Sequence, residues 1–345
     1  MSPLTLTLFL TSLTTSTTIV MLSHHWLLAW LALELNTLSI LPMITKQHHP
    51  RATEAATKYF LTQAAAAALI LFTSTVNAWQ TGQWNITMSN TTLTTTMITF
   101  ALMLKLGLAP VHFWYPEVLQ GSTLLTALLI STWQKIAPLT LLYMTMPTLP
   151  TNVTLLIGVT STLIGGWAGL NQTQTRKIMA FSSIAHMGWL ITVITMNPSL
   201  TTLTYLMYVI MTSSLFISLN INTTNSIASL STVWSHSPML LTMMMLTLMA
   251  LGGLPPLSGF MPKWLILKEL TEANLFMLST TMAMASLPSL FFYIRMTYTT
   301  TLTLTPTSTN IKHNWRFKTP HTLIHTATMT TTKNLLPMMP TLYTT

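Results

Sequence analysis

Long apolar runs separated by short polar segments dominate the chain, and most of these runs are close to the length of one membrane crossing. A helix needs about 20 apolar residues to cross the hydrocarbon core of a bilayer. The runs lack the strict alternation of polar and apolar residues that marks the strands of a transmembrane β-barrel. The pattern predicts an all-α polytopic membrane protein with about eleven transmembrane helices, at residues 4–22, 26–44, 59–79, 92–118, 124–144, 153–170, 178–196, 200–219, 239–270, 275–296 and 322–342.

Glycine and proline interrupt two of these runs. The interrupting residues are Gly107, Pro110 and Pro116 in the fourth run and, 146 positions later, Gly253, Pro256 and Pro262 in the ninth. Helices in lipid stay unbroken unless the freed backbone groups find partners in protein or in a water-filled cavity. Paired interruptions in two halves of a chain point to the working centre of a transporter built from inverted repeats. We therefore expect two discontinuous helices, each beside a functional site.

The composition agrees with a membrane-embedded chain. Hydrophobic residues make up 50% of the sequence and charged residues only 6%, and the mean hydropathy is +0.55. A soluble domain has about 25% charged residues, so this surface is too poor in charge for water. The composition excludes a soluble metabolic enzyme.

The positive charges gather on one side of the predicted membrane domain. Threading the spans from the N-terminus places these residues at loops or span ends on that side: Lys46, Arg51, Lys58, Arg176, Lys177, Arg295, Lys312, Arg316 and Lys318. By the positive-inside rule, this side and the N-terminus face the compartment of synthesis, and an odd number of spans puts the C-terminus opposite. The net charge of +9 therefore reflects topology and does not indicate nucleic-acid binding.

Several kinds of chemistry find no support in the sequence. The chain has no cysteine, which excludes thiolate-bound iron–sulfur clusters, disulfides and thiol redox chemistry within it. Its ten histidines form no clear metal motif, and the adjacent pairs at 24–25 and 48–49 flank predicted helices, where interfacial histidines are expected. The glycine-rich stretch 164–169 lacks the strand and spacing of a dinucleotide site and indicates close helix packing instead.

Three local features complete the organisation of the chain. The alanines at 64–68 should let a neighbouring helix approach closely. Glu54 is expected in a basic loop, and Ile227, Leu230 and Trp234 follow helical spacing that predicts a short interfacial helix. Residues 297–310 are a threonine-rich linker.

Four charged residues fall inside predicted spans and away from the span ends, namely Glu34, Lys105, Lys135 and Lys263. Each costs roughly 2.5–3.5 kcal/mol on membrane-insertion scales, and an apolar residue would pack more cheaply. A buried ion pair that pins two helices is the structural alternative for any one of them. Together they indicate a functional route for charge.

Polar residues stand near these charges. Ser131 and Thr132 precede Lys135 by four and three residues, on the same face of a helix, and the serines at 182–183 stand in the same relation to His186. Burial and a nearby carboxylate act in opposite directions on the proton affinity of a lysine. A lysine held between these influences gains or loses a proton when a neighbour changes its charge. The sequence thus suggests a proton relay whose members are Glu34, Lys105, Lys135, His186 and Lys263. For His186, a structural histidine in a serine-lined niche is the alternative role.

The residue usage hints at the compartment. The N-terminus lacks the basic region of a signal peptide and the arginine-rich character of a transit peptide. Threonine, leucine, methionine and proline abound, aspartate is absent, and glycine and valine are scarce, which suits a coding strand poor in guanine. We expect a chain encoded and inserted in animal mitochondria.

Three motifs resemble those of the antiporter-like membrane subunits of respiratory complex I. They are Leu-Gly-Leu-Ala-Pro-Val-His-Phe-Trp-Tyr-Pro-Glu at 106–117, the stretch 166–188 from Gly-Trp-Ala-Gly-Leu-Asn to Ser-Ser-Ile-Ala-His-Met-Gly, and Gly-Leu-Pro-Pro-Leu-Ser-Gly-Phe-Met-Pro-Lys at 253–263. The resemblance extends over essentially the whole chain, which looks like the short animal form that lacks three leading helices of its bacterial relatives.

The resemblance implies an architecture and a set of site residues. It implies two inverted five-helix repeats, 1–145 and 150–297, each with a discontinuous fourth helix, then a linker at 298–321 and a C-terminal helix at 322–345. By the family's motifs, Glu34 is the membrane glutamate, Lys105 its partner lysine, Lys135 the central lysine and Lys263 the lysine of the second broken helix. His112 and His186 fall at histidine positions of the family.

The resemblance also implies a function, namely proton translocation in the inner mitochondrial membrane. The chain itself is expected to hold no cofactor, while NADH, FMN, iron–sulfur clusters and ubiquinone are bound by partner subunits. Expected partners are other complex I membrane subunits, including further antiporter-like chains, and membrane lipids. The N-terminus and the basic loops would face the matrix, and the C-terminus the intermembrane space.

Two alternatives stay open at this point. A stand-alone Mrp-type cation/proton antiporter shares the fold, although a single buried glutamate and the lack of aspartate argue against a dedicated cation site. A purely structural spacer between pumping neighbours would keep its membrane charges only as ion pairs.

Overall fold

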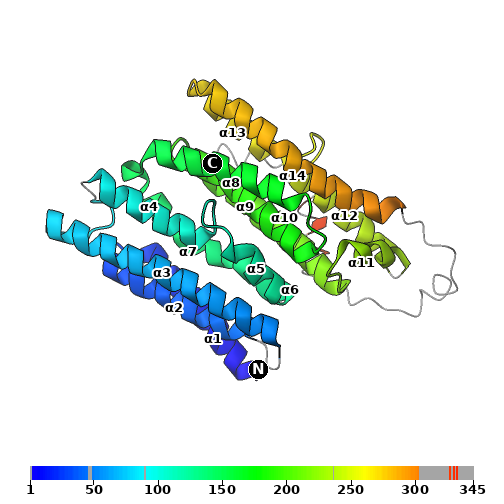
Figure 1. The fold of residues 1–345 in the computed structure, drawn as a ribbon, viewed down its shortest axis with the longest axis horizontal. Coiled ribbons are helices and arrows are strands. Elements are labelled where there is room, and N and C mark those ends of the chain that lie inside the picture. The colour runs from blue at the N-terminus through cyan, green and yellow to red at the C-terminus, as the bar shows by residue number, and fades with distance from the viewer. Residues whose placement is uncertain are drawn as a thin grey trace. The chain divides into compact units, whose positions relative to one another are not determined.

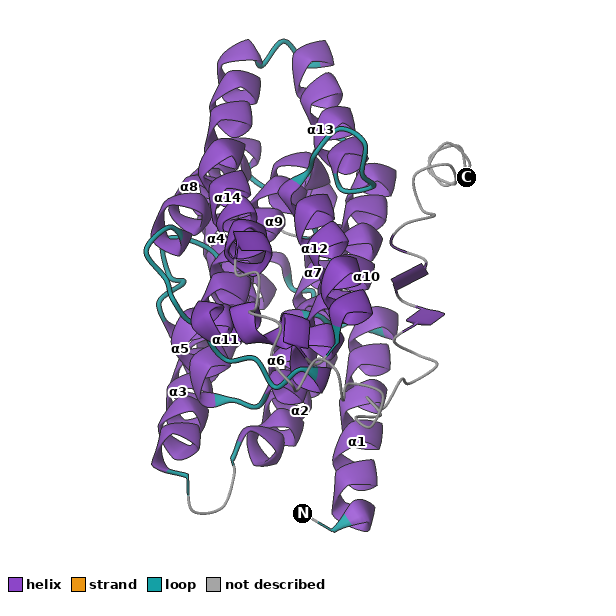
Figure 2. Ribbon diagram, turned by 90° about the vertical axis from the view of Figure 1, so that its right-hand side faces the viewer, coloured by secondary structure: helices purple, strands orange, loops and turns teal. Residues whose placement is uncertain are grey.

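The computed structural model describes residues 2–45, 49–88, 91–235, 237–302, 326–327, 329–330 and 332. Within these residues the regular secondary structure is entirely helical, and the only bridges between extended segments are two isolated ones (Figure 2). The all-α prediction is therefore confirmed. Most of the expected C-terminal span at 322–342 and most of the expected linker lie outside the described residues.

The chain divides into two compact units, Met1–Ser161 and Thr162–Thr345, and the boundary falls inside helix α8 (Figure 1). The helices up to this boundary are α1 (Pro3–Leu22), α2 (Trp26–Ile44), α3 (Pro50–Thr81), α4 (Thr92–Leu106), α5 (Trp114–Gly121), α6 (Leu124–Ser131), the 3-10 turn η1 (Trp133–Lys135), α7 (Ile136–Met144), η2 (Met146–Thr148) and α8 (Thr151–Gly169). Unit 2 continues with α9 (Thr175–Ile194), α10 (Pro198–Ile221), α11 (Ile227–Thr232), η3 (Val233–Ser235), α12 (Pro238–Gly252), α13 (Phe260–Glu272) and α14 (Phe276–Leu302).

Eight helical segments of the described chain are long and apolar enough to cross a membrane. They match eight of the uninterrupted runs in the sequence, with α6, η1 and α7 forming one of them. The first halves of the two interrupted runs, α4 and α12, are shorter apolar helices. Helix α14 reaches Leu302 and so includes the first residues of the expected linker.

Hydroxyl-rich sequences form these helices because their side chains bond to the backbone. Thr91, Thr123 and Asn197 cap α4, α6 and α10 by accepting a hydrogen bond from a backbone N–H of the first turn. Inside the helices, hydroxyls such as that of Thr99 donate to the carbonyl three residues earlier. A buried hydroxyl thereby finds a partner in an environment that offers no bulk water.

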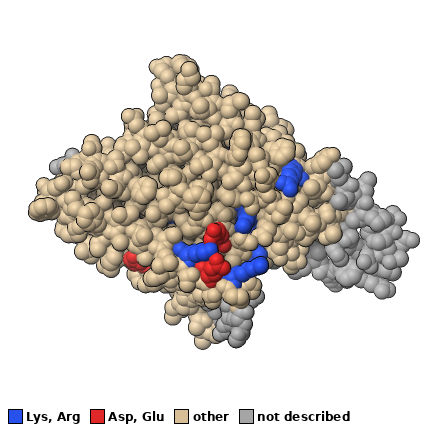
Figure 3. Space-filling model, in the orientation of Figure 1, with Lys and Arg blue, Asp and Glu red and all other residues tan. Residues whose placement is uncertain are grey.

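Helix α3 begins nine residues earlier than the apolar run predicted, and Glu54 lies in this helix and not in a loop. Glu54 and Lys58 form an ion pair one helical turn apart, and Lys58 also pairs with Glu117 of α5. The apolar run in the sequence ends at these charged residues, but the helix continues through them because their pairing one turn apart stabilises it. These side chains are 40–61% exposed. Most of the face drawn in Figure 3 carries no Lys, Arg, Asp or Glu atoms.

The small-residue segments pack as expected. Ala66 and Ala67 are fully buried, and Trp30 of α2 donates to the Ala67 carbonyl at 3.1 Å. A Cβ on Gly165 would lie 2.7 Å from the Ala185 nitrogen, so the 164–169 stretch of α8 is in close contact with α9. The predicted short helix after α10 is also present, as α11 and η3.

Candidate functional site

The two interruptions share their spacing, a left-handed glycine and several backbone hydrogen bonds, whereas the cis peptide bond Ala109–Pro110 occurs in the first and has no equivalent in the second. Residues 107–113 separate α4 from α5 and residues 253–259 separate α12 from α13, again 146 positions apart. Gly107 (φ 72°) and Gly253 (φ 82°) both adopt the left-handed conformation that ends a helix, which glycine reaches without steric cost. The hydrogen bonds correspond residue by residue: Leu108 N to Met103 O and Leu254 N to Met249 O, then Val111 N to Leu108 O and Leu257 N to Leu254 O. Both predicted discontinuous helices are confirmed.

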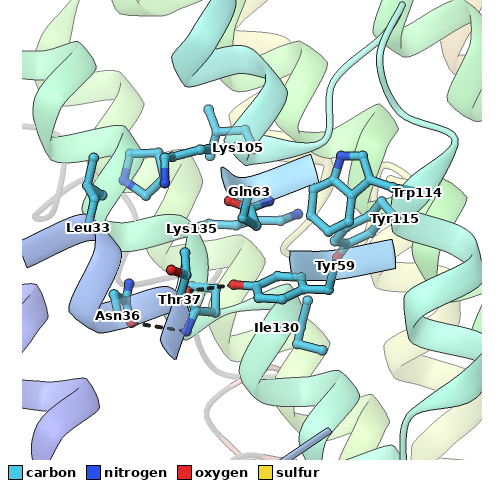
Figure 4. A pocket seen from close by; sticks show the side chains of 13 residues that line it. Leu33, Asn36, Thr37, Tyr59, Gln63, Lys105, Trp114, Tyr115, Ile130 and Lys135 are labelled. Carbon is cyan, nitrogen blue, oxygen red and sulfur yellow. Dashed lines mark hydrogen bonds between the residues drawn. The ribbon is translucent and has the colours of Figure 1, made fainter. Parts of the chain in front are cut away.

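In unit 1, the first interruption lies beside a water-sized cavity of about 10 Å³ (Figure 4). Lys105, in the last turn of α4, and Lys135, in η1, both line it, and each is less than 10% exposed. Polar side chains from two other helices complete the lining: Asn36 and Thr37 from α2, and Tyr59 and Gln63 from α3. The structure thus brings together two of the lysines that the sequence singled out.

Lys135 lies in a helix interruption that the sequence analysis did not predict. The fifth span, expected as one helix over 124–144, is divided by η1 into α6 and α7. Pro138 has no N–H to donate to the carbonyl of Gln134, so the regular hydrogen-bond ladder cannot continue there. The tighter turn changes which residues share a face, and both Gln134 and Lys135 line the cavity. The proline four residues after Gln134 was the available signal.

Tyr115 helps to hold the ammonium of Lys135. The Lys135 Nζ atom lies 5.1 Å from the centre of the Tyr115 ring, a cation–π geometry that is favourable when desolvated. Tyr115 is 1% exposed and stands at the start of α5, directly after the first interruption. The geometry of the interruption therefore contributes to the placement of Lys135.

A chain of polar side chains ties the Lys135 turn to two other helices. The Gln134 amide donates to Asn36 Oδ1 at 3.0 Å, and the Tyr59 hydroxyl lies 3.5 Å from Gln134 Oε1 (Figure 4). Asn36 and Tyr59 are each 2% exposed. The sequence analysis missed these residues because it sought charges, although a buried amide inside an apolar span is itself a signal.

Three buried donors on residues that line this cavity have no hydrogen-bond partner in the described part of the chain, namely Lys105 Nζ, Gln63 Nε2 and Trp114 Nε1. Native structures satisfy nearly all buried polar groups. One water molecule fits the space and would accept from such donors. The cavity is therefore suited to a hydrated, protonatable pair of lysines.

Glu34 lies next to this cavity without lining it. The carboxylate is half-buried on α2, two residues before Asn36, and accepts from the Thr37 hydroxyl at 3.2 Å. Its partnership with Lys105 stays a prediction.

The structure places His112 apart from these groups. His112 lies in the first interruption and is 5% exposed, and its ring contacts Phe113 at 4.4 Å between centroids. It does not line the unit 1 cavity. The hydroxyls of Ser131 and Thr132 donate to the carbonyl of Leu128 in their own helix.

In unit 2, His186 and Lys263 line a second small cavity, of about 20 Å³, together with Thr204 and Tyr208 of α10. The Tyr293 hydroxyl of α14 lies 3.5 Å from His186 Nε2. Lys263 donates to the carbonyl of Gly252 at 3.0 Å, across the second interruption. This unit therefore repeats the combination of an interrupted helix, a lysine, here only partly buried, and a water-sized space.

Metal ligands do not gather in the described residues. No group of three or more histidine or carboxylate side chains is close enough there to hold a metal ion. Each cavity is lined by at least one lysine, a side chain that can bind and release a proton.

Two known families together match residues 23–343 of the chain. The family described as "NADH:quinone oxidoreductase/Mrp antiporter, TM" matches residues 23–289, and "NADH dehydrogenase subunit 2 C-terminus" matches residues 290–343. NADH-ubiquinone oxidoreductase chain 2 of Carassius auratus is 54% identical over 345 residues, which cover 100% of this chain and 99% of that protein. The Gallus gallus protein of the same name is 54% identical over 333 residues, 95% of each chain.

Solved structures share the fold. A chain of respiratory complex I from Thermus thermophilus with bound aureothin has a TM-score of 0.84 and 26% identity, over 95% of this chain and 76% of that one. A chain of the Mrp complex from Dietzia has a TM-score of 0.77 and 17% identity, over 82% and 58%, which shows a shared fold alone. By its fold and its matched family, the protein is of the antiporter-like membrane class. The chain belongs to the family of NADH-ubiquinone oxidoreductase chain 2, and the resemblance stated from its motifs is confirmed.

Proposed function

We propose that this chain is a core membrane subunit of respiratory complex I that moves protons through buried lysines. The observation that carries the proposal is the recurrence, in each unit, of an interrupted helix with a lysine at a water-sized cavity, buried in unit 1 and partly buried in unit 2. Lys105, Lys135 and the nearby Glu34 serve unit 1, and His186 and Lys263 serve unit 2. His112 is assigned to the first interruption and not to the cavity.

The energetics of the proposed step suit lysine. Moving one charge against about 150–200 mV costs roughly 3.5–4.6 kcal/mol. That free energy corresponds to a swing of about 2.5–3.5 pKa units in a carrier group, which buried lysines can reach when a neighbouring charge changes. NADH oxidation and quinone reduction in partner subunits would supply that change.

The proposal includes the finer architecture. Eleven spans would form two inverted five-helix repeats, 1–145 and 150–297, followed by a linker at 298–321 and a final helix at 322–345. The constant offset of 146 positions between the two interruptions supports the repeat architecture. The same offset relates their glycines and prolines, the ends of the flanking helices and the backbone hydrogen bonds. The chain would lie in the inner mitochondrial membrane, with the N-terminus and the basic loops toward the matrix and the C-terminus toward the intermembrane space.

Cofactors and partners follow from membership of the complex. FMN, iron–sulfur clusters, NADH and ubiquinone would be held by other subunits, and the direct neighbours would be further membrane subunits, antiporter-like chains among them, and lipids. A structural spacer is the rival within the same complex. It would tolerate the loss of Lys135, whereas a pump would not.

A stand-alone Mrp-type antiporter is the rival outside the complex, and the coupling ion separates the two. On native gels we expect the chain to migrate with NADH–quinone reductase activity. In vesicles containing the complex, NADH-driven acidification should be equal in sodium and in choline medium and should collapse with a protonophore. A chain that migrates alone, together with transport that disappears without sodium, would contradict the proposed function.

A further inference from the structure

Lys263 lies on one half of an interrupted helix and bonds to the other half. Its side chain starts in the first turns of α13, and its Nζ atom donates to the carbonyl of Gly252, the last residue of α12, at 3.0 Å. The C-terminal end of a helix carries a partial negative charge, so an ammonium is stabilised there. The contact therefore holds the charge of Lys263 at the end of α12.

Aligning the two interruptions by their offset of 146 positions shows that the first interruption has no lysine at the position equivalent to Lys263. Subtracting the offset of 146 places Lys263 opposite Glu117, and Lys105 opposite Leu251. Glu117 turns to Lys58 at an exposed ion pair. In unit 1, Lys105 stands in the last turn of α4, at the end of the first half-helix. In unit 2, Lys263 starts in α13 and reaches back across the interruption to the end of α12.

Gly253 is the residue that leaves room for this return. A Cβ at Gly253 would lie 2.9 Å from Lys263 Nζ, 3.1 Å from Cδ and 3.2 Å from Cε. At Gly107, the equivalent position, a Cβ would instead meet ring and side-chain atoms of Trp114 and Tyr115. The glycine in unit 2 is therefore needed for the lysine as well as for its backbone angle of +82°.

We propose that Gly253 is a positioning residue for Lys263: its missing side chain leaves the space through which Lys263 crosses the interruption to the Gly252 carbonyl. The inference rests on the proposed function, in which Lys263 exchanges protons. The titratable groups that share its cavity are His186 from α9 and Tyr208 from α10, and no acidic residue is among those that line the cavity. The proton affinity of Lys263 then depends on the carbonyl contact that Gly253 permits.

Gly82 offers a matched control for the test. It also ends a helix in the left-handed conformation, at φ +71°, but a Cβ there would meet nothing within 4 Å. Gly82→Ala and Gly253→Ala both place an alanine in the left-handed conformation, and only Gly253→Ala puts a Cβ against Lys263. The experiment compares both variants with Lys263→Ala and with the double variant Gly253→Ala/Lys263→Ala in the intact complex, measuring assembled complex and protons moved per electron pair.

The expected result is that Gly82→Ala complexes are normal, while Gly253→Ala complexes lose as many protons per electron pair as Lys263→Ala complexes, with no further loss in the double variant. If Gly253→Ala also lowers the amount of complex, shortening Lys263 in the double variant should restore it. A Gly253→Ala complex that matches Gly82→Ala, or an assembly defect that Lys263→Ala does not relieve, would overturn the inference. A normal proton ratio in the Lys263→Ala single variant would instead contradict the proposed function of unit 2.

Discussion

Replacing Gly259 by alanine is expected to lower the amount of assembled complex about tenfold or more. Gly259 lies directly before α13, and its backbone packs against the last turn of α12, so that a Cβ would lie 1.8 Å from the Ala250 carbonyl oxygen. Backbone cannot yield as a flexible side chain does, and overpacking of this kind typically costs about 1–3 kcal/mol and occasionally more. Changes of about 1–2 kcal/mol already alter protein abundance several-fold.

Gly252→Ala is the matched control for this prediction. It adds the same methyl group at a neighbouring glycine of unit 2, where the nearest atoms would lie at 3.7 Å or more. Complex assembly should remain normal with that change. Native gels that show equal amounts of complex for Gly252→Ala and Gly259→Ala would be incompatible with the packing described for the second interruption.

Exchanging Glu34 or Lys105 for glutamine is expected to lower NADH–quinone turnover about tenfold, equivalent to about 1.4 kcal/mol. In the proposed relay Glu34 is the acidic partner of Lys105, and no acidic side chain is among those that line the unit 1 cavity. Each single change leaves one charge without its counterpart in a low-dielectric setting. The double variant should be no worse than the more damaging single variant, because the two residues act as a unit.

The surface pair Lys268 and Glu272 provides the control for this cycle. Its atoms lie 3.5 Å apart and both side chains are more than half exposed, so that the pair contributes at most about 1 kcal/mol. Glutamine at either position should leave turnover unchanged. If the double variant instead loses turnover by the product of the two single losses, Glu34 and Lys105 act independently and the prediction is wrong.

The interruptions could be predicted from the sequence because glycine and proline leave a local signal. Gly107 and Gly253 adopt the left-handed conformation that their residue type permits, and the repeated spacing identified both sites before any contact was known. The buried lysines were equally visible, since a charge inside an apolar run is costly. Local chemistry was sufficient for these features.

Other features depend on contacts between distant parts of the chain. The bond from Gln134 to Asn36 joins residues 98 positions apart, and no local pattern identifies such partners. The return of Lys263 to Gly252 also required the path of the chain through the interruption. The early start of α3 was missed for another reason, because an apolar run ends at the first charges whereas the helix continues through its own ion pair.

The central claim is that the buried lysines of this chain carry protons, and the most direct test is the number of protons moved per electron pair by complexes carrying Lys135→Ala. The measurement uses complexes reconstituted in vesicles, with assembly checked on native gels. The account predicts that the complexes assemble while proton movement falls or NADH oxidation stalls. Normal pumping and normal turnover in assembled complexes would contradict it and would make the membrane charges of this chain structural.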